Sequence, residues 1–118
     1  MAVERHYVTG GIPARLDAIG DEARLTDADI AKLLDTSAQT IARWRQGVTP
    51  RPEQRDRLLD LHWIASQLAA VYEPDDTNLW LYSRHPRLNG ERPADRIGRG
   101  DVGDVLALVN QLRTGAYT

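Results

Sequence analysis

The sequence predicts an all-α protein in which a helix-turn-helix bundle is joined by a long central helix to a smaller helical half. Apolar residues recur every three or four positions along most of the chain, which is the spacing of one helix face. Alternation of apolar and polar residues, the pattern of a half-buried strand, is scarce. The rigid stretch VTPRP at 48–52 divides the chain. We therefore expect a tail and helix-turn-helix over 1–50, and the long helix and second half over 51–118.

Three helices are expected in the first half. The first covers 12–19 after a glycine pair, and its apolar stripe is formed by Ile12, Leu16 and Ile19. Thr26 is expected to cap the second helix, because acidic residues follow it in the positively polarised first turn. Ser37 or Thr36 is expected to cap the third helix, over 38–46, and Gly47 suits the position after its end.

The second half is expected to contain four helices. The first is long and apolar around much of its circumference, which indicates a central core helix. Prolines start two of the shorter ones, as is common at the first position of a helix. The expected ranges are 52–72, a short helix from Pro74 through Leu81, 93–97 and 102–113, with a loop over 83–93.

Composition excludes several classes of protein. The chain has no cysteine, so disulfides and thiolate metal sites are excluded. No apolar run approaches the roughly 20 residues that cross a membrane, and the charged start lacks the apolar segment of a secretory signal, so we expect a cytoplasmic protein. His6, His62 and His85 have no metal-binding spacing, and GRGDVG at 98–103 does not follow a strand. We therefore expect no enzyme activity, metal or cofactor.

Although the formal net charge is −2, the arginines are concentrated in two segments. The segments 43–57 and 84–99 each contain five arginines and two acidic residues. Arginine suits two-donor contacts with phosphate, carboxylate or guanine. The alternative is that these side chains lie on solvated faces and form ion pairs within the chain.

Residues 29–47 have the pattern of a helix-turn-helix. The residues expected to be buried are Ile30, Leu34, Ile41 and Trp44, with the small Ala31 where the two helices cross. Asp35 stands where such turns usually have glycine, and aspartate tolerates a left-handed φ at some cost. The same arrangement also serves simply to pack three helices or to support a dimer, so the motif alone leaves both interpretations open.

The second helix of such a motif lies in the major groove and presents its first residues to the base edges. Glutamine can pair with adenine and arginine with guanine. The predicted DNA contacts are Ser37, Gln39, Thr40 and Arg43 for bases, with Arg45 and Arg51 placed for phosphates. Operator DNA is therefore an expected partner, and the negative total charge does not oppose this because only the docking face must be positive.

The second half resembles the toxin-binding domain of the Xre/MbcA/ParS-type antitoxins. Motifs of that domain match, in order, Trp80 and Leu81, Pro86 and Leu88, Gly90 and Pro93, a Val-rich helix over 105–112, and Gly115. The resemblance covers roughly 12–117, including the helix-turn-helix, and the architecture resembles the MbcA subgroup most.

The resemblance implies an antitoxin that binds and inhibits a RES-domain toxin, usually one that destroys NAD⁺. It also implies that the antitoxin represses its own operon. A stand-alone helix-turn-helix regulator with a ligand- or partner-sensing second half is the alternative. The candidate toxin contacts are Trp80, Tyr82, Arg84, Arg87, Leu88, Arg92, Pro93, Gly115 and Tyr117. We expect a homodimer or a toxin-bridged hetero-oligomer, because one chain carries one recognition helix and a palindrome needs two.

Three of these residues have open roles. Trp80 can pack on the long helix and order the following loop, or it can contact the toxin directly. At the tail, Gly115 would let the chain turn away from the last helix. Tyr117 and the terminal carboxylate would then enter the toxin's NAD⁺ cleft. The alternative is that this end of the chain has no role.

Overall fold

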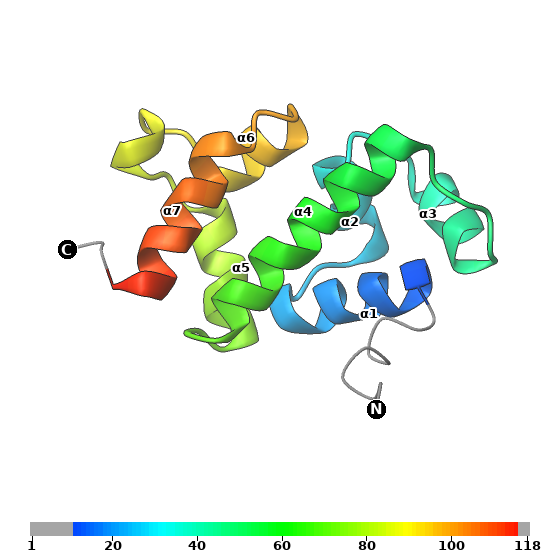
Figure 1. The fold of residues 1–118 in the computed structure, drawn as a ribbon, viewed down its shortest axis with the longest axis horizontal. Helices are drawn as coiled ribbons and strands as arrows, with labels where there is room; N and C mark the ends of the chain where they lie inside the picture. The colour runs from blue at the N-terminus through cyan, green and yellow to red at the C-terminus, as the bar shows by residue number, and fades with distance from the viewer. Residues whose placement is uncertain (1–10, 116–118) are drawn as a thin grey trace.

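A computed structural model describes residues 11–115, and it is helical throughout (Figure 1). The elements are α1 Gly11–Ala23, α2 Asp27–Leu33, α3 Ala38–Arg45, α4 Pro52–Ala69, α5 Pro74–Tyr82, the 3₁₀ turn η2 Pro86–Leu88, α6 Pro93–Gly98 and α7 Gly103–Thr114. Over 11–115 the only extended pairing is a single bridge between His85 and Glu91. None of these helices is long and apolar enough to cross a membrane. The all-α prediction is confirmed.

The helix starts in the first half are fixed by side-chain caps. The Thr26 hydroxyl accepts a hydrogen bond from the Asp29 N–H, and the Asp29 carboxylate accepts one from the Thr26 N–H, which is a complete capping box. The Ser37 hydroxyl accepts from the Thr40 N–H at 3.1 Å, so Ser37 rather than Thr36 caps α3. Asp35 has a φ of +54° in the turn, as predicted. Ile30, Ala31, Leu34, Ile41 and Trp44 are all buried, as predicted.

Two helices end at places that the sequence did not predict. α1 continues past the expected end to Ala23, because its buried stripe continues from Leu16 and Ile19 to Ala23. α4 ends at Ala69, three residues before the expected Tyr72. The apolar Val71, which the predicted helix 52–72 included, follows this end and is 45% exposed.

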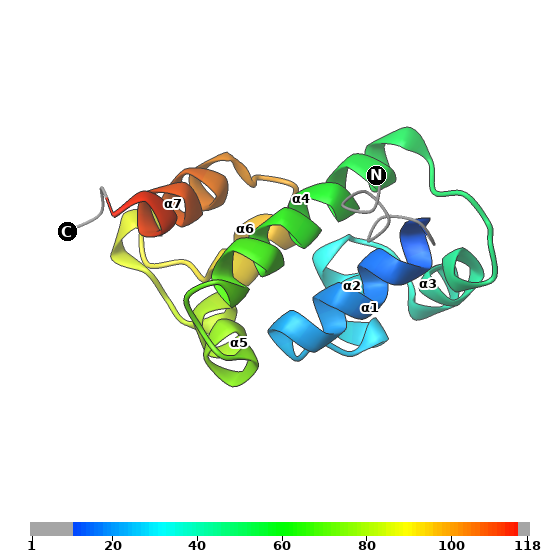
Figure 2. The ribbon, with the colours of Figure 1, turned by 60° about the horizontal axis from the view of Figure 1, so that its bottom comes forward.

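α4 is the central helix, and it packs on α1 on one side and on α7 on the other (Figures 1 and 2). Its buried residues are Leu58, Leu61, Ile64, Ala65 and Leu68. Residues on both sides of position 50 contribute to one continuous hydrophobic core. The division into residues 1–50 and 51–118 therefore remains a prediction about folding units, and the packing does not separate them.

Arg57 of α4 links the two halves. Its Nη2 donates hydrogen bonds to the carbonyl oxygens of Ile97 at 2.8 Å and Gly98 at 2.9 Å, at the end of α6. A longer contact of 3.4 Å reaches the carbonyl of Leu33 at the end of α2. A single cationic group thus stabilises carbonyls at two helix C-termini, where the helix dipole also favours positive charge.

Candidate functional site

The helix α3 presents a polar face next to the α3–α4 linker. Gln39 and Arg43 are exposed, and Thr40 is half-buried. Ser37 is exposed, but its hydroxyl is occupied by the cap and by the Thr40 hydroxyl at 3.0 Å. Gln39 and Arg43 are therefore the side chains that this helix offers most freely to a partner.

Arg45 lies differently from Arg43. Its Nε and Nη2 donate to both carboxylate oxygens of Asp27 at 2.9 and 2.8 Å, and its Nη1 donates to Asp17 at 2.7 Å. The hydrogen bonds from Arg45 lower the pKa of the Asp27 carboxyl, and the same contacts raise the pKa of Arg45. The guanidinium thus ties α3 to α1 and α2 instead of pointing outward. The predicted phosphate contact of Arg45 stays a prediction, and it would require these ion pairs to open.

The start of α4 adds exposed positive charge beside α3. Arg51 and Arg55 are exposed, and among the residues that the structure describes neither forms an ion pair. Arg55 also borders a surface groove of about 420 Å³ formed by the end of α3, the linker and the start of α1. The cations available to a polyanion on this side are therefore Arg43, Arg51 and Arg55.

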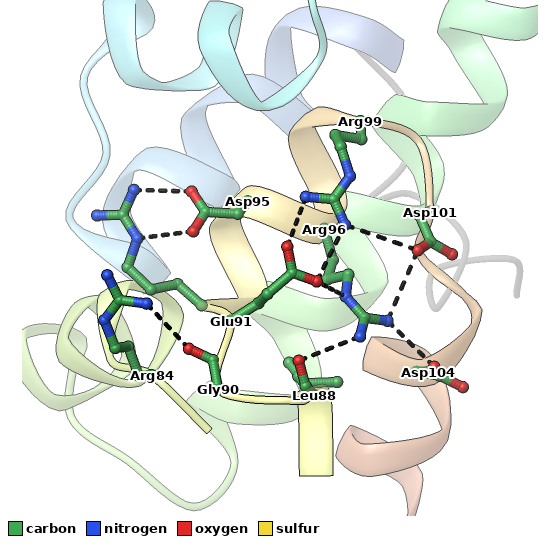
Figure 3. A network of polar contacts seen from close by, with 10 residues as sticks. Arg84, Leu88, Gly90, Glu91, Asp95, Arg96, Arg99, Asp101 and Asp104 are labelled. Atoms are coloured by element: carbon green, nitrogen blue, oxygen red, sulfur yellow. Dashed lines mark hydrogen bonds and ion pairs between the residues drawn. The ribbon is translucent and has the colours of Figure 1, made fainter. Parts of the chain in front are cut away.

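The second arginine segment is largely neutralised within the chain (Figure 3). Arg96 is almost fully buried, and it donates to Glu91 at 2.6 Å, to Asp104 at 3.1 Å and to the Leu88 carbonyl at 3.1 Å. Arg99 also binds the Glu91 carboxylate, at 2.7 and 3.1 Å. The hydrogen bonds from Arg99 and Arg96 lower the pKa of Glu91 to about 2. Ion pairing, the alternative considered above, is confirmed for this segment.

This network fixes the shape of the segment 84–92. Arg96 donates a hydrogen bond to the carbonyl of Leu88, the last residue of the 3₁₀ turn η2. The next residue, Asn89, lies in the left-handed region with a φ of 58° and ends the turn. Sequence reasoning did not single out Arg96. The available signal was the spacing of acidic residues at 91, 101 and 104 around it, which matters only once α6 and α7 are packed together.

The arginines proposed for the toxin have defined positions. Arg84 donates to the Gly90 carbonyl at 3.1 Å, and Arg87 donates to Gln111 of α7 at 2.8 Å. Arg92 makes a two-point contact with Asp95, at 3.0 and 2.7 Å, and its guanidinium lies 5.8 Å from the centre of the Tyr82 ring. Arg84 and Arg87 are exposed, whereas Arg92 and Tyr82 are half-buried.

Two candidate toxin contacts lie inside the protein. Leu88 is 1% exposed and Pro93 is buried, so in this conformation their side chains cannot touch a partner. Their direct contact with a toxin stays a prediction, and it would require this segment to change conformation. Both side chains pack in the interior next to the exposed loop. This packing alone is a sufficient reason for their presence in the motif, even if neither side chain contacts a toxin.

Trp80 is half-buried, which supports its expected packing role, and its direct contact with a toxin stays a prediction. It packs partly buried against the core, and it also lines a cavity of about 190 Å³ together with Tyr72, His85, Leu108 and Leu112. The His85 Nδ1 accepts a hydrogen bond from the Arg87 N–H at 3.2 Å, so a neutral His85 carries its proton on Nε2. Burial, followed by the charge of Arg87, lowers the pKa of His85.

The tail is only partly described. Gly115 ends α7 with a φ of 75°, so the chain turns there as expected of glycine. Tyr117 lies outside the described residues. Among residues 11–115 no three His, Asp or Glu side chains gather where they could hold a metal ion.

Comparison with known proteins gives three similar chains. The mycobacterial cidal antitoxin MbcA of Mycobacterium tuberculosis is 33% identical over 94 residues, which cover 79% of this chain and 83% of that protein. The probable mycobacterial cidal antitoxin Rv3188 of the same species is 30% identical over 93 residues, covering 79% and 80%. A chain of the crystal structure of the M. tuberculosis MbcT–MbcA toxin–antitoxin complex matches with a TM-score of 0.76 and 28% identity, over 92% of this chain and 98% of that one. No protein-family model matches.

Proposed function

This chain belongs to the family of the mycobacterial antitoxin MbcA, and from that premise we propose that it neutralises a RES-domain toxin that degrades NAD⁺ and represses its own operon. The observation that carries the proposal is the fold shared, along nearly its whole length, with a chain of a toxin–antitoxin complex. The family is one of antitoxins, so the protein acts by binding rather than by catalysis. An NAD⁺-degrading toxin and an operator both lie in the cytoplasm, where we expect the protein to act.

The toxin surface that we propose is the outer side of the segment 80–92. Arg84 and Arg87 are exposed on it and can bind carboxylates at the rim of the toxin's cleft. Trp80 and Tyr82 supply aromatic contact area, and such residues carry much of the binding energy in interfaces. Leu88 and Pro93 support this surface from below. The tail from Gly115 to Tyr117 is proposed to enter the cleft itself.

The cavity beside Trp80 is suited to a side chain of a protein partner. Its volume of about 190 Å³ is below the roughly 300–1,000 Å³ usual for small-molecule sites. A space of that size suits a single apolar side chain of a protein partner.

The operator surface that we propose is the exposed side of α3 with the start of α4. Gln39 and Arg43 face outward for base edges, and Arg51 faces outward for a phosphate. A palindromic operator places two half-sites about 34 Å apart, so the DNA-binding species is a homodimer or a toxin-bridged assembly.

The test is inhibition of the toxin in solution. The cognate RES-domain toxin of this proposal is purified, and NAD⁺ loss is followed with increasing amounts of the antitoxin. We expect NAD⁺ loss to stop at a fixed molar ratio and the mixture to elute as one complex. Undiminished NAD⁺ loss with the antitoxin in excess, and no complex, would reject the proposal. A gel shift with the promoter fragment tests repression separately.

A further inference from the structure

A second surface of the protein has the properties of an interface. α4 and α7 lie side by side (Figure 1), and between them is an open groove of about 370 Å³. Its lining consists of Asp60, Trp63, Leu106, Ala107 and Asn110. Trp63 is 38% exposed, a large area for so apolar a side chain.

The packing of α4 does not need Trp63. The buried residues of this helix, including Leu61, Ile64 and Leu68, form one stripe, and Trp63 lies on the opposite side. A single exposed apolar residue is ordinary, but Trp63 adjoins the half-buried Leu106 and the exposed Ala107. The groove is therefore a continuous apolar patch on two helices rather than an isolated side chain.

The rim of the groove is acidic. Asp56 and Asp60 lie one helical turn apart, and among the residues that the structure describes neither forms an ion pair. Burial and the charge of Asp56 raise the pKa of the Asp60 carboxyl. At the far end, the Arg113 Nε donates to Gln67 at 3.0 Å. Arg57, one turn before Asp60, donates to the carbonyls of Ile97 and Gly98 instead of pairing with Asp60.

The acidic rim of the groove indicates which kind of partner it can bind. DNA is excluded because its phosphates would meet these carboxylates. A second copy packed symmetrically on this face would bring two such acidic pairs together, and like charges across an interface are strongly unfavourable. A partner with an apolar side chain flanked by arginine or lysine complements the groove.

The toxin also needs more surface than the segment 80–92 supplies. A stable interface covers roughly 800 Å² and 20–30 residues on each side, whereas this segment has 13 residues, of which Leu81 and Leu88 are buried. The exposed face of α7 continues it, because Gln111 of α7 binds Arg87 of the loop at 2.8 Å and Ala107 lies one turn away, in the groove. One partner can therefore cover the loop, the outer face of α7 and the groove without a gap.

We propose that the groove between α4 and α7 is a second contact surface for the toxin, which places an apolar side chain against Trp63 and an arginine or lysine beside Asp60. This inference rests on the proposed function. It assigns a toxin-binding role to the middle of the central helix.

The experiment measures the affinity of the purified RES-domain toxin for the parent chain and four variants by titration calorimetry. Trp63→Ala removes an aromatic contact and is expected to weaken binding roughly 10- to 100-fold. Ala107→Arg fills the groove and places a positive charge next to the arginine or lysine proposed for the toxin. It is expected to weaken binding at least as much. Asp60→Asn is expected to cost roughly 3- to 10-fold at low salt and less at high salt. Leu79→Ala is the matched control, because Leu79 is 65% exposed on α5 and lies outside the groove.

Thermal melting of each variant verifies that it folds, and Ala107→Arg, which retains Trp63, provides a second measure if Trp63→Ala is unstable. Toxin affinities of both variants equal to that of the parent chain would overturn the inference and leave the proposed function standing. Failure of the parent chain to bind the toxin would instead reject the proposed function. A change from dimer to monomer in Trp63→Ala, with unchanged toxin affinity, would identify the groove as a contact between antitoxins and also overturn the inference.

Discussion

Arg43 and Arg45 lie two residues apart on the recognition helix, and the structure predicts opposite consequences for their loss. The Arg43 side chain is exposed, whereas the Arg45 guanidinium binds Asp27 and Asp17. Arg43→Ala should therefore affect DNA binding without affecting stability. Arg45→Ala should chiefly affect stability.

The loss expected for Arg43→Ala follows from its place on the outward face. A two-donor contact between arginine and guanine discriminates by about 1–3 kcal/mol. That corresponds to roughly 5- to 150-fold in operator affinity, with relaxed preference at one base pair. The melting temperature should not change, because the side chain contributes nothing to the core.

The loss expected for Arg45→Ala is smaller and concerns folding. The exposed fractions of the side chains are 32% for Arg45, 41% for Asp27 and 67% for Asp17, so solvent screens these pairs, and the network is worth about 1 kcal/mol. For a domain of this size that lowers the melting temperature by roughly 3–6 °C. Arg45 lowers the pKa of Asp27. The stabilisation is thus complete above the unfolded value of about 3.9 and is lost as the pH falls through the lower folded pKa.

The two variants are compared by gel shift on the native promoter and on single-base variants of it, and by thermal melting at pH 7 and near pH 3. The difference in melting temperature between Arg45→Ala and the parent should shrink at the lower pH. An Arg45→Ala protein with normal stability and the larger, base-specific loss of DNA affinity would refute the assignment. In that case Arg45 leaves its carboxylates when DNA binds.

Three further predictions concern the second half. Leu88→Ala should lose about 2–5 kcal/mol of stability together with toxin affinity. Arg87→Ala should lose toxin affinity alone. Melting curves and titrations with the toxin distinguish the two results. Glu91→Gln should remove stability that the parent retains down to about pH 2, because the lowered pKa of Glu91 keeps its ion pairs intact as the pH falls; the measurement is the melting temperature between pH 2 and 7. Deletion of 115–118 should leave toxin binding largely intact but allow NAD⁺ loss to resume, and full inhibition by the truncated chain would confine the block to the segment 80–97.

The starts of the helices could be predicted from the sequence because their causes are local. A Thr26 hydroxyl or a proline at position 52, 74 or 93 acts on its own first turn. The ends depended on packing. α1 passes through Gly20 because Ala23 is buried, and α4 ends where Val71 would face solvent. Neither outcome is encoded in the residues at the end itself.

The candidate site could be predicted less well, because the role of an arginine depends on what lies opposite it. Nothing in the segment 43–57 distinguishes Arg43 from Arg45, and their difference arises from Asp17 and Asp27 on other helices. Leu88 illustrates the same limit for an apolar residue. A residue of a binding motif can be buried beneath the binding surface, and the sequence does not show whether its side chain is buried or exposed.

The arrangement of charges also explains how a chain with a net charge of −2 can present a surface suited to DNA. Asp17 and Asp27 are neutralised by Arg45, so these two carboxylates do not repel phosphates next to Arg43. Asp60, which forms no ion pair within residues 11–115, lies in the groove between α4 and α7, where we propose a basic part of the toxin. If this separation is what permits repression, Asp27→Asn should leave operator affinity nearly unchanged. Removing Arg45 while retaining Asp27 should lower the affinity for all sequences alike, and increasingly so at low salt.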